Sequence, residues 1–166
     1  MGWAAFDTER FGARRVLFLA HREEILLQAE AAFQRVQPKA RVGRYTGTRR
    51  DEGVDLLFAS VQTLGQERHL EDFSATHFDY IVVDEFHHAA AATYRRLLQH
   101  FRPRFLLGLT ATPERADQSD ILSLCDDNLV YSYSLFDGVS AGLLCPFTYS
   151  GMCRPWMSPA TSRRPR

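Results

Sequence analysis

The stretch YIVVDEFH, residues 80–87, decides the fold: four largely apolar residues are followed by two carboxylates and a histidine. A second apolar run, FLLGLTATP at residues 105–113, ends in two threonines and a proline. Continuous apolar runs of this length are typical of strands that are buried on both faces of a parallel sheet. Because ligands bind at the carboxyl edge of such sheets, the polar residues that follow these strands are candidates for a functional site.

The same pattern recurs along the chain and predicts an α/β fold. Further apolar runs occupy residues 16–19 and 56–59. Between the runs, residues 22–36 and 94–101 repeat apolar side chains at the period of a helix. Strands that alternate with helices form a mainly parallel sheet with helices on its faces. The patterns also predict additional strands at residues 41–45 and 129–135, and short helices at residues 116–127 and 138–144.

The length and charge of the chain set limits on its organisation. With 166 residues, of which 45% are hydrophobic and 24% are charged, it fits one globular domain. The formal net charge is zero, but residues 154–166 hold four arginines and no acid, which leaves residues 1–153 with sixteen basic and twenty acidic side chains. We therefore expect a folded domain over residues 1–150 and a disordered, arginine-rich tail over residues 151–166. Net charge gives no argument for nucleic-acid binding.

The cysteine pattern and the hydropathy favour a cytoplasmic protein. Cys125, Cys145 and Cys153 form neither an even set nor a closely spaced metal-binding pair, and reduced thiols are typical of the cytoplasm. No apolar run approaches the ~20 residues that a membrane-spanning helix needs. We therefore expect no membrane partner.

The carboxylates of Asp84 and Glu85 are the strongest catalytic candidates. At the end of a buried strand, an aspartate can hold Mg²⁺ and a neighbouring acid can polarise an attacking water, as phosphoryl transfer requires. His87 can sense a bound phosphate or contact a partner motif. Two other interpretations stay open: a carboxylate can cap the following helix, or His87 and His88 can bind zinc. Zinc is disfavoured because adjacent histidines do not face one way and no third ligand is near.

Hydroxyl, amide and basic side chains follow the other strands. Thr110 and Thr112 can hydrogen-bond a neighbouring carboxylate or histidine, although alone they also fit an ordinary turn. His21 and Arg22 stand where a helix begins, and backbone N–H groups there favour phosphate. Arg22 can equally pair with a surface acid.

Two loop segments are further candidates for contacts with a phosphate backbone. Thr46 and Gly47 lie in a turn rich in hydroxyl and guanidinium groups, and Gln62 and Thr63 follow the strand at residues 56–59. Contacts of this kind bind phosphate groups without reading base sequence. Both segments are also compatible with plain loops.

Taken in order, these motifs resemble those of superfamily 2 helicases, in the DEAD/DEAH-box group that includes the type III restriction subunit and UvrB-like enzymes. Five segments carry the resemblance: LAHRE at 19–23, TG at 46–47, SVQT at 60–63, VDEFH at 83–87 and LTATP at 109–113. Residues 84–87 stand where that group has its Asp-Glu-x-His box. The resemblance implies the first RecA-like domain of a P-loop NTPase, which is an α/β layer fold with a mainly parallel sheet.

The resemblance also implies roles for individual residues. Asp84 would hold the Mg²⁺ that accompanies ATP, and Glu85 would activate water. His87, Thr110 and Thr112 would couple hydrolysis to movement along a nucleic acid. Contacts with the nucleic-acid backbone would come from a further set, His21, Arg22, Thr46, Gly47, Gln62 and Thr63. DNA is favoured over RNA as the partner.

The sequence departs from the helicase pattern at the phosphate-binding loop. That family has a G-x-x-x-x-G-K-[ST] loop, but the single lysine of this chain, Lys39, has no glycine-rich loop before it. The second RecA-like domain, with its arginine fingers, is also missing after residue 151. We therefore expect a truncated first motor domain that binds ATP and Mg²⁺ weakly or not at all and is inactive alone. The alternative is a non-catalytic nucleic-acid-binding or regulatory module that kept the fold.

The missing phosphate-loop strand leads to one further structural expectation. It would lie beside the strand at residues 105–109, so its absence leaves an apolar edge, and such edges recruit other strands. We expect either self-association through this edge or its coverage by residues 129–135.

Overall fold

The computed structural model describes residues 2–111 and 122–145 of the chain. By their contacts the residues form two compact units, Met1–Leu129 and Val130–Arg166, and each unit is described by itself. Thr112 and the arginine-rich tail over residues 151–166 lie outside the described residues.

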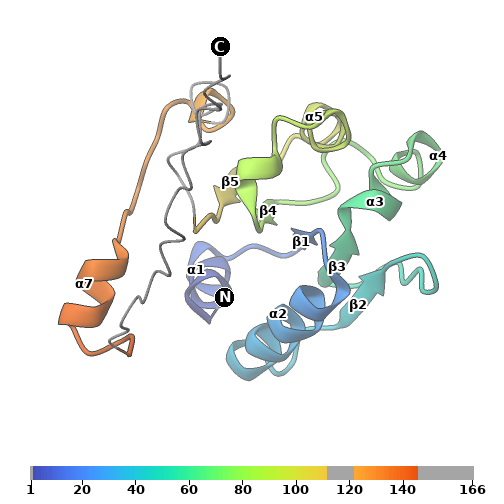
Figure 1. The fold of residues 1–166 in the computed structure, drawn as a ribbon. Coiled ribbons are helices and arrows are strands. Elements are labelled where there is room, and N and C mark those ends of the chain that lie inside the picture. The colour runs from blue at the N-terminus through green and yellow to red at the C-terminus, as the bar shows by residue number, and fades with distance from the viewer. Residues whose placement is uncertain (1, 112–121, 146–166) are drawn as a thin grey trace, which may run out of the picture. The chain divides into compact units, whose positions relative to one another are not determined.

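Five strands form the central sheet of the first unit (Figure 1). They are β1 (Val16–Ala20), β2 (Val42–Tyr45), β3 (Leu56–Ser60), β4 (Tyr80–Val83) and β5 (Phe105–Gly108). Their order in the sheet is β2-β3-β1-β4-β5, and all neighbouring pairs are parallel. The predicted α/β fold with a parallel sheet is confirmed, and so is the strand expected at residues 41–45.

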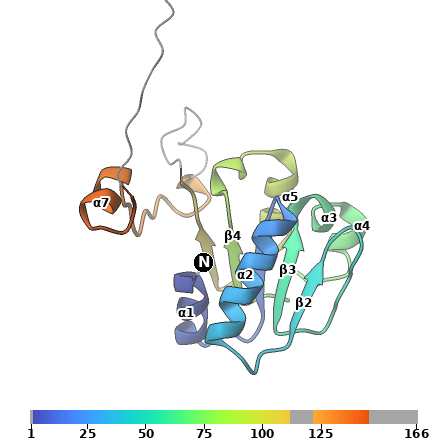
Figure 2. The ribbon, with the colours of Figure 1, turned by 60° about the horizontal axis from the view of Figure 1, so that its bottom comes forward.

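Helices cover both faces of this sheet (Figures 1 and 2). The helices α1 (Gly2–Phe11) and α2 (Glu23–Val36) lie on one face, whereas α3 (Val61–Leu64), α4 (Glu67–Leu70) and α5 (Ala92–His100) lie on the other. A short 3-10 helix, η1 (Phe86–His88), follows β4. The helices predicted at residues 22–36 and 94–101 are confirmed within two residues at each end. None of the described helices is long and apolar enough to cross a membrane.

Alternate residues of each strand enter two separate hydrophobic cores, which explains why the strands are apolar throughout. On one face, Leu17 of β1 and Ile81 of β4 pack in the same cluster as Leu97 of α5. On the other face, Phe18 of β1 packs with Phe33 of α2. The burial of both strand faces is the property that distinguishes a parallel sheet from a half-solvated antiparallel one.

The outer edge of β2 is shielded by the chain that follows it. After Tyr45 the backbone turns back, and the N–H of Asp51 donates to the carbonyl of Arg44 at 2.9 Å. Gly43 permits this close return, because a Cβ there would lie 2.7 Å from the Cβ of Asp51. A returning segment of this kind protects an edge strand from pairing with another chain.

The other edge of the sheet is β5, and the segment expected to cover it forms no strand. Within the described chain β5 pairs with β4 alone. Residues 129–134 have no regular structure, and their large apolar side chains are exposed, with Tyr131 at 74%. The predicted strand at residues 129–135 is therefore wrong.

The second unit contains α7 (Leu135–Ser140), which begins at the last residue of the predicted strand. Ser134 and Asp137 form a reciprocal capping box, in which the Ser134 hydroxyl accepts from the Asp137 N–H at 3.1 Å and the Asp137 carboxylate accepts from the Ser134 N–H at 3.0 Å. This box starts a helix at residue 135.

The two short helices predicted in the C-terminal part also differ from the structure. The helix expected at residues 138–144 begins earlier, as α7, and ends before Gly142, which adopts a left-handed φ of 69°. Of the helix expected at residues 116–127, residues 116–121 lie outside the described residues. In the remainder only residues 122–123 are helical, and residues 124–127 form a turn.

Candidate functional site

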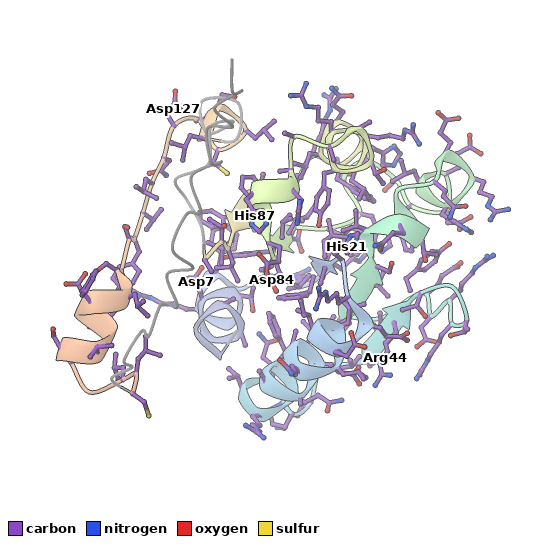
Figure 3. The ribbon with its side chains drawn as sticks, viewed as in Figure 1. Asp7, His21, Arg44, Asp84, His87 and Asp127 are labelled. Atoms are coloured by element: carbon purple, nitrogen blue, oxygen red, sulfur yellow. The ribbon has the colours of Figure 1, made fainter. Side chains whose placement is uncertain are left out.

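The candidate catalytic residues lie at the carboxyl edge of the sheet, where β1, β4 and β5 end side by side. The N–H of Asp84 donates to the carbonyl of Leu19 at 2.9 Å, which fixes the end of β4 against β1. On the other side, the N–H of Leu109 donates to the carbonyl of Val83 at 2.9 Å. Figure 3 shows Asp84, His87 and His21 together at this edge. Ligands of open parallel sheets bind at this position.

The turn that follows β4 has an unusual backbone conformation at Glu85. This residue has a φ of 52° and a ψ of 47°, in the left-handed region that residues other than glycine rarely adopt. It separates the extended strand β4 from η1. Strained backbone of this kind persists where the surrounding structure holds it, and such positions are concentrated at functional sites.

Close packing behind the turn holds it in place. The N–H of Phe86 donates to the carbonyl of Leu109 at 2.8 Å, and the Phe86 ring is buried. Gly108 of β5 lies directly beneath the ring, because a Cβ at this position would lie 2.6 Å from its Cγ. The packing of Phe86 against β5 thus requires a glycine at position 108.

The turn after β4 that begins with Asp84 and Glu85 is called the acidic turn below. His87 connects it to the residues that follow β5. Its Nδ1 atom lies 3.1 Å from Oε2 of Glu85 and 3.2 Å from Oγ1 of Thr110. The same ring nitrogen of His87 thus contacts both residues. Of the two partners that the sequence suggested for the Thr110 hydroxyl, a carboxylate or a histidine, the structure places the histidine, His87, within 3.2 Å. Thr112 lies outside the described residues.

Asp84 is a half-buried carboxyl group whose ionised form is disfavoured. Burial is the main cause that raises its pKa, a hydrogen bond from the backbone of Glu85 opposes this effect, and the charge of Glu85 adds to it. Among the described residues no arginine, lysine or histidine forms an ion pair with Asp84. The charge of His87 has the opposite effect and lowers the pKa of Asp84. A half-buried carboxylate attracts a hard cation more strongly than a fully exposed one does.

These features fit Mg²⁺ with few protein ligands. No group of three or more His, Cys, Asp or Glu side chains in the described part of the chain could enclose a metal ion. Mg²⁺ does not need such a group, because it keeps several waters and binds through one or two carboxylates together with substrate phosphates. Asp84 fits the role of such a ligand, with Glu85 beside it.

Residues that were predicted to contact nucleic acid follow β1 and β3 at the same edge. Gln62 joins two of these segments, since its Nε2 lies 2.7 Å from Nδ1 of His21 and donates to the His21 carbonyl at 3.1 Å. The Ser60 hydroxyl donates to Oε1 of Gln62 at 2.7 Å and orients the amide. The His21 and Gln62 side chains are both exposed, so they remain accessible to a ligand.

The other predicted nucleic-acid contacts differ in exposure. Arg22 is exposed and occupies the N-cap position of α2, and Gly47 is exposed in the loop after β2. Thr46 and Thr63 are 4% and 8% exposed. Arg22 and Gly47 are therefore the members of this group with most surface to offer a phosphate.

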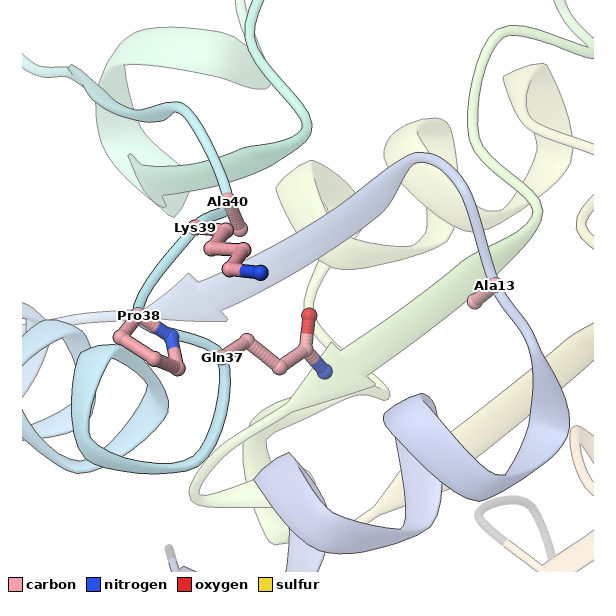
Figure 4. A pocket seen from close by; sticks show the side chains of 5 residues that line it. All are labelled: Ala13, Gln37, Pro38, Lys39 and Ala40. Atoms are coloured by element: carbon pink, nitrogen blue, oxygen red, sulfur yellow. The ribbon is translucent and has the colours of Figure 1, made fainter.

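The single lysine lies at the opposite edge of the sheet. Lys39 is in the segment between the end of α2 and the start of β2. It lines an open hollow with Ala13, Gln37, Pro38 and Ala40 (Figure 4). Since Ala13 precedes β1, this hollow is at the amino edge, and Asp84 is at the carboxyl edge. Lys39 therefore cannot act as a phosphate-loop lysine for the Asp84 site.

Two further residues act near this edge: His88, which the sequence suggested only as a zinc ligand, and Tyr94, which it did not single out for the site. His88 places its ring 4.1 Å from that of His87 and 6.2 Å from that of His21, between centroids. Tyr94 of α5 is buried, and burial together with the charges of Asp84 and Glu85 raises its pKa to about 12. Tyr94 looks ordinary in the sequence, because it fits the apolar face of a helix.

Comparison with known proteins agrees with this geometry. Residues 4–115 match the family described as "Type III restriction enzyme, res subunit", and the chain belongs to this family of superfamily 2 helicases. The matched residues include β1 to β5 and the acidic turn. The helicase resemblance of the ordered motifs is confirmed.

Individual relatives are much longer than this chain. It is 33% identical over 154 residues to "Putative ATP-dependent helicase IRC3" of Saccharomyces cerevisiae, a match that covers 87% of this chain and 22% of that protein. It is 30% identical over 142 residues to "Type I restriction enzyme EcoAI endonuclease subunit" of Escherichia coli, a match that covers 81% of this chain and 17% of that protein. The chain thus spans about a fifth of the length of these relatives.

A solved structure shares the fold. The Hef helicase domain of Pyrococcus furiosus matches with a TM-score of 0.61 and 20% identity, over 75% of this chain and 30% of that one. At this identity the likeness concerns the fold alone, and it supports the RecA-like assignment.

Proposed function

We propose that this chain provides the metal-binding and coupling part of an ATP-dependent helicase motor. The observation that carries the proposal is the contact of His87 with both Glu85 and Thr110, beside the half-buried carboxyl group of Asp84. Asp84 would hold Mg²⁺, which neutralises the developing charge on the phosphates when it is bound. Glu85 would polarise the attacking water, and His87 would transmit a change at Glu85 to Thr110 and Thr112.

The same proposal gives the carboxyl edge a second ligand, a nucleic-acid backbone. Support comes from His21, Arg22 and Gln62, which are exposed at the ends of β1 and β3. Contacts from such side chains to phosphates are independent of base sequence and weaken with salt. DNA is the proposed substrate, and RNA of matched length is the comparison that tests this choice.

We further propose that the 166-residue polypeptide alone hydrolyses ATP negligibly. The sequence contains no G-x-x-x-x-G-K-[ST] loop, and Lys39 lies at the other edge of the sheet. Without a lysine and a backbone cradle, the β- and γ-phosphates lose their main contacts. ATP and Mg²⁺ would then bind weakly to this chain.

The outer edge of β5 is the proposed site of self-association. Among the described strands, none pairs with this side of β5, and all four of its residues are half-buried. Sedimentation velocity over a range of concentrations tests the proposal: reversible dimerisation supports it, and a monomer at all concentrations contradicts it.

The nucleotide sequence upstream of Met1 tests the main proposal most cheaply. An in-frame Gly-Lys-Thr or Gly-Lys-Ser loop would place this chain within a longer motor. A genuine start codon with no such loop would instead favour the alternative, a nucleic-acid-binding or regulatory module that kept the fold. Cytoplasmic location stays a prediction.

A further inference from the structure

Four arginines lie at the amino edge of the sheet, which is the edge opposite the acidic turn. Arg14 and Arg15 directly precede β1, and Arg102 and Arg104 lie between α5 and β5. All four residues are exposed, and they are called the amino-edge cluster below. None of them belongs to the five segments that carry the helicase resemblance.

Backbone hydrogen bonds hold these segments around Asp79, the residue that precedes β4. The N–H groups of Arg14 and Arg15 each donate to Oδ2 of Asp79 at 3.1 Å. On the other side of β4, the N–H of Arg104 donates to the Asp79 carbonyl at 2.8 Å. Because β4 lies between β1 and β5, and neighbouring strands are ~4.8 Å apart, the backbones of the two arginine pairs are held roughly 10 Å apart.

The positive charge of the amino-edge cluster is not compensated. None of its four guanidinium groups forms an ion pair within the described part of the chain. The Asp79 carboxylate is occupied by two backbone N–H groups, and Asp55, which precedes β3, pairs with Arg41 at 2.8 Å. Repulsion between like charges destabilises a compact chain, so a bound anion would stabilise this edge.

An aromatic ring orients one of the four guanidinium groups. The guanidinium carbon of Arg104 lies over the Phe11 ring, 5.0 Å from its centroid. The Phe11 ring in turn packs against the rings of Tyr80 and Phe105, with centroids 5.5 and 5.6 Å away. A guanidinium over an aromatic face keeps the N–H groups in its own plane available, and this planar fork matches two oxygens of a phosphate.

We propose that the amino-edge cluster binds the phosphate backbone of duplex DNA, at a surface separate from the carboxyl edge. A duplex carries one charge per ~1.7 Å of its axis, against ~3.4 Å for each of its strands, and so attracts uncompensated arginines more strongly. It also offers two rows of phosphates across grooves about 6–12 Å wide, so that each arginine pair can contact one row.

A single strand fits this surface less well than a duplex does. Single-stranded nucleic acids are bound largely by stacking of their bases on exposed aromatic rings. At the amino edge, the guanidinium of Arg104 lies over Phe11 and competes with a base for that ring. The inference goes beyond the proposed function, because it depends neither on the metal site nor on the residues of the carboxyl edge.

Two double variants of the 166-residue chain each remove one arginine pair: Arg14→Gln with Arg15→Gln, and Arg102→Gln with Arg104→Gln. The matched control is Arg41→Gln, because this arginine lies at the same edge and already has an acidic partner. Binding of a short labelled DNA duplex is measured by fluorescence anisotropy at several salt concentrations. Thermal unfolding of each variant checks the fold.

Each double variant should lower the slope of log affinity against log salt by about two, since each lost phosphate contact lowers it by about one. Arg41→Gln should leave the slope unchanged. The melting temperatures of the double variants should stay the same or rise, because repulsion between the arginines is removed.

Three results would overturn the proposal. The first is a wild-type slope in both double variants, and the second is an equal loss of slope in Arg41→Gln. The third is displacement of the duplex by polyglutamate at an equal concentration of charge, which would show that the cluster takes acidic protein segments instead of DNA.

A titration of the ¹⁵N-labelled wild type needs no substitution and separates this inference from the proposed function. Addition of duplex DNA should shift the backbone amide resonances of Arg15, Asp79 and Arg104. If duplex and single-stranded DNA shift only residues of the carboxyl edge, such as His21 and Gln62, the inference is wrong and the proposed nucleic-acid contacts stand. If neither edge responds to either DNA, both fail.

Discussion

Nδ1 of His87 lies 3.2 Å from Oγ1 of Thr110, across the ends of the neighbouring strands β4 and β5. The two residues are 23 positions apart in the sequence. The same Nδ1 atom also lies 3.1 Å from the Glu85 carboxylate, so His87 contacts both Glu85 and Thr110. We propose that this contact couples ATP hydrolysis at Glu85 to movement along a nucleic acid.

Substitution of Thr110 by valine should change the environment of the His87 ring without unfolding the protein. Thr110 is exposed, so we expect the free energy of unfolding to change by less than about 0.5 kcal/mol. Long-range ¹H–¹⁵N correlation spectra should show a changed His87 Nδ1 resonance. Thr48→Val, on the loop after β2, is the control and should leave that resonance in place. An identical His87 spectrum in Thr110→Val would show that the contact is not made in solution.

Gly108→Ala should destabilise the fold and disturb the acidic turn. The new Cβ would lie 2.6 Å from Cγ of the buried Phe86 ring, and overpacking of this kind costs about 1–3 kcal/mol. Chemical denaturation measures the change in the free energy of unfolding. Gly47→Ala is the matched control, since nothing lies within 4 Å of a Cβ there. Equal stability of the two variants would mean that Phe86 does not pack against β5 as described.

Asp84→Asn should make the protein more stable at neutral pH. The pKa of Asp84 in the folded protein is raised above its ordinary value of 3.8, mainly by burial. Between these two values the folded state binds more protons than the unfolded chain, so stability falls as the pH rises through this window. Above this pH window, the stability that the protonated Asp84 contributed has been lost completely. Unfolding free energies measured from pH 3 to pH 8 should show a gain for Asp84→Asn at pH 7 that disappears near the ordinary pKa.

In the same experiment, Asp55→Asn should change the free energy of unfolding at pH 7 in the opposite direction. The side chain of Arg41 donates to the Asp55 carboxylate at 2.8 Å and lowers its pKa. This stabilisation is present above the ordinary pKa and is lost as the pH falls through the lowered value. Asp55→Asn should therefore be slightly less stable than the wild type at pH 7, and the difference should be small because the pair is largely exposed. Parallel pH profiles for the two variants would contradict the burial of Asp84.

Arg22→Ala should weaken binding of single-stranded DNA. Arg22 is exposed at the carboxyl edge, beside His21 and Gln62. Loss of one phosphate contact reduces the slope of log affinity against log salt by about one. The control is Arg35→Ala, which removes a charge from the other end of α2, at the amino edge of the sheet. Equal losses for the two variants, measured by fluorescence anisotropy at several salt concentrations, would place the binding surface elsewhere.

The sequence was sufficient for the part of the fold in which hydrophobic periodicity is strong. The apolar runs that form β1, β3, β4 and β5 are apolar on both faces. A strand that is buried on one face only would instead alternate apolar and polar residues. The acidic turn was also predictable, because carboxylates that end a buried strand cannot avoid the carboxyl edge. The contact of His87 with Thr110 follows from the pairing of β4 with β5.

Other features depend on contacts that no local pattern encodes. Residues 129–134 were predicted as part of a strand but have no regular structure, and the capping box of Ser134 and Asp137 starts a helix at residue 135. Tyr94 fits the apolar face of α5, and only the three-dimensional structure brings its hydroxyl under the influence of Asp84. The left-handed conformation of Glu85 is likewise held by tertiary contacts of Phe86, whose N–H donates to the Leu109 carbonyl and whose ring lies against Gly108.

A single-turnover ATPase assay of the 166-residue chain tests the central claim most directly. The chain is mixed in excess with radiolabelled ATP and Mg²⁺, without nucleic acid or with single- or double-stranded DNA or RNA, and phosphate release is followed. Our account predicts no release above the rate of buffer, because the metal and coupling residues are present without a phosphate-binding loop. Release well above that rate, abolished by Glu85→Gln, would contradict it and would show that this chain forms a complete ATP site.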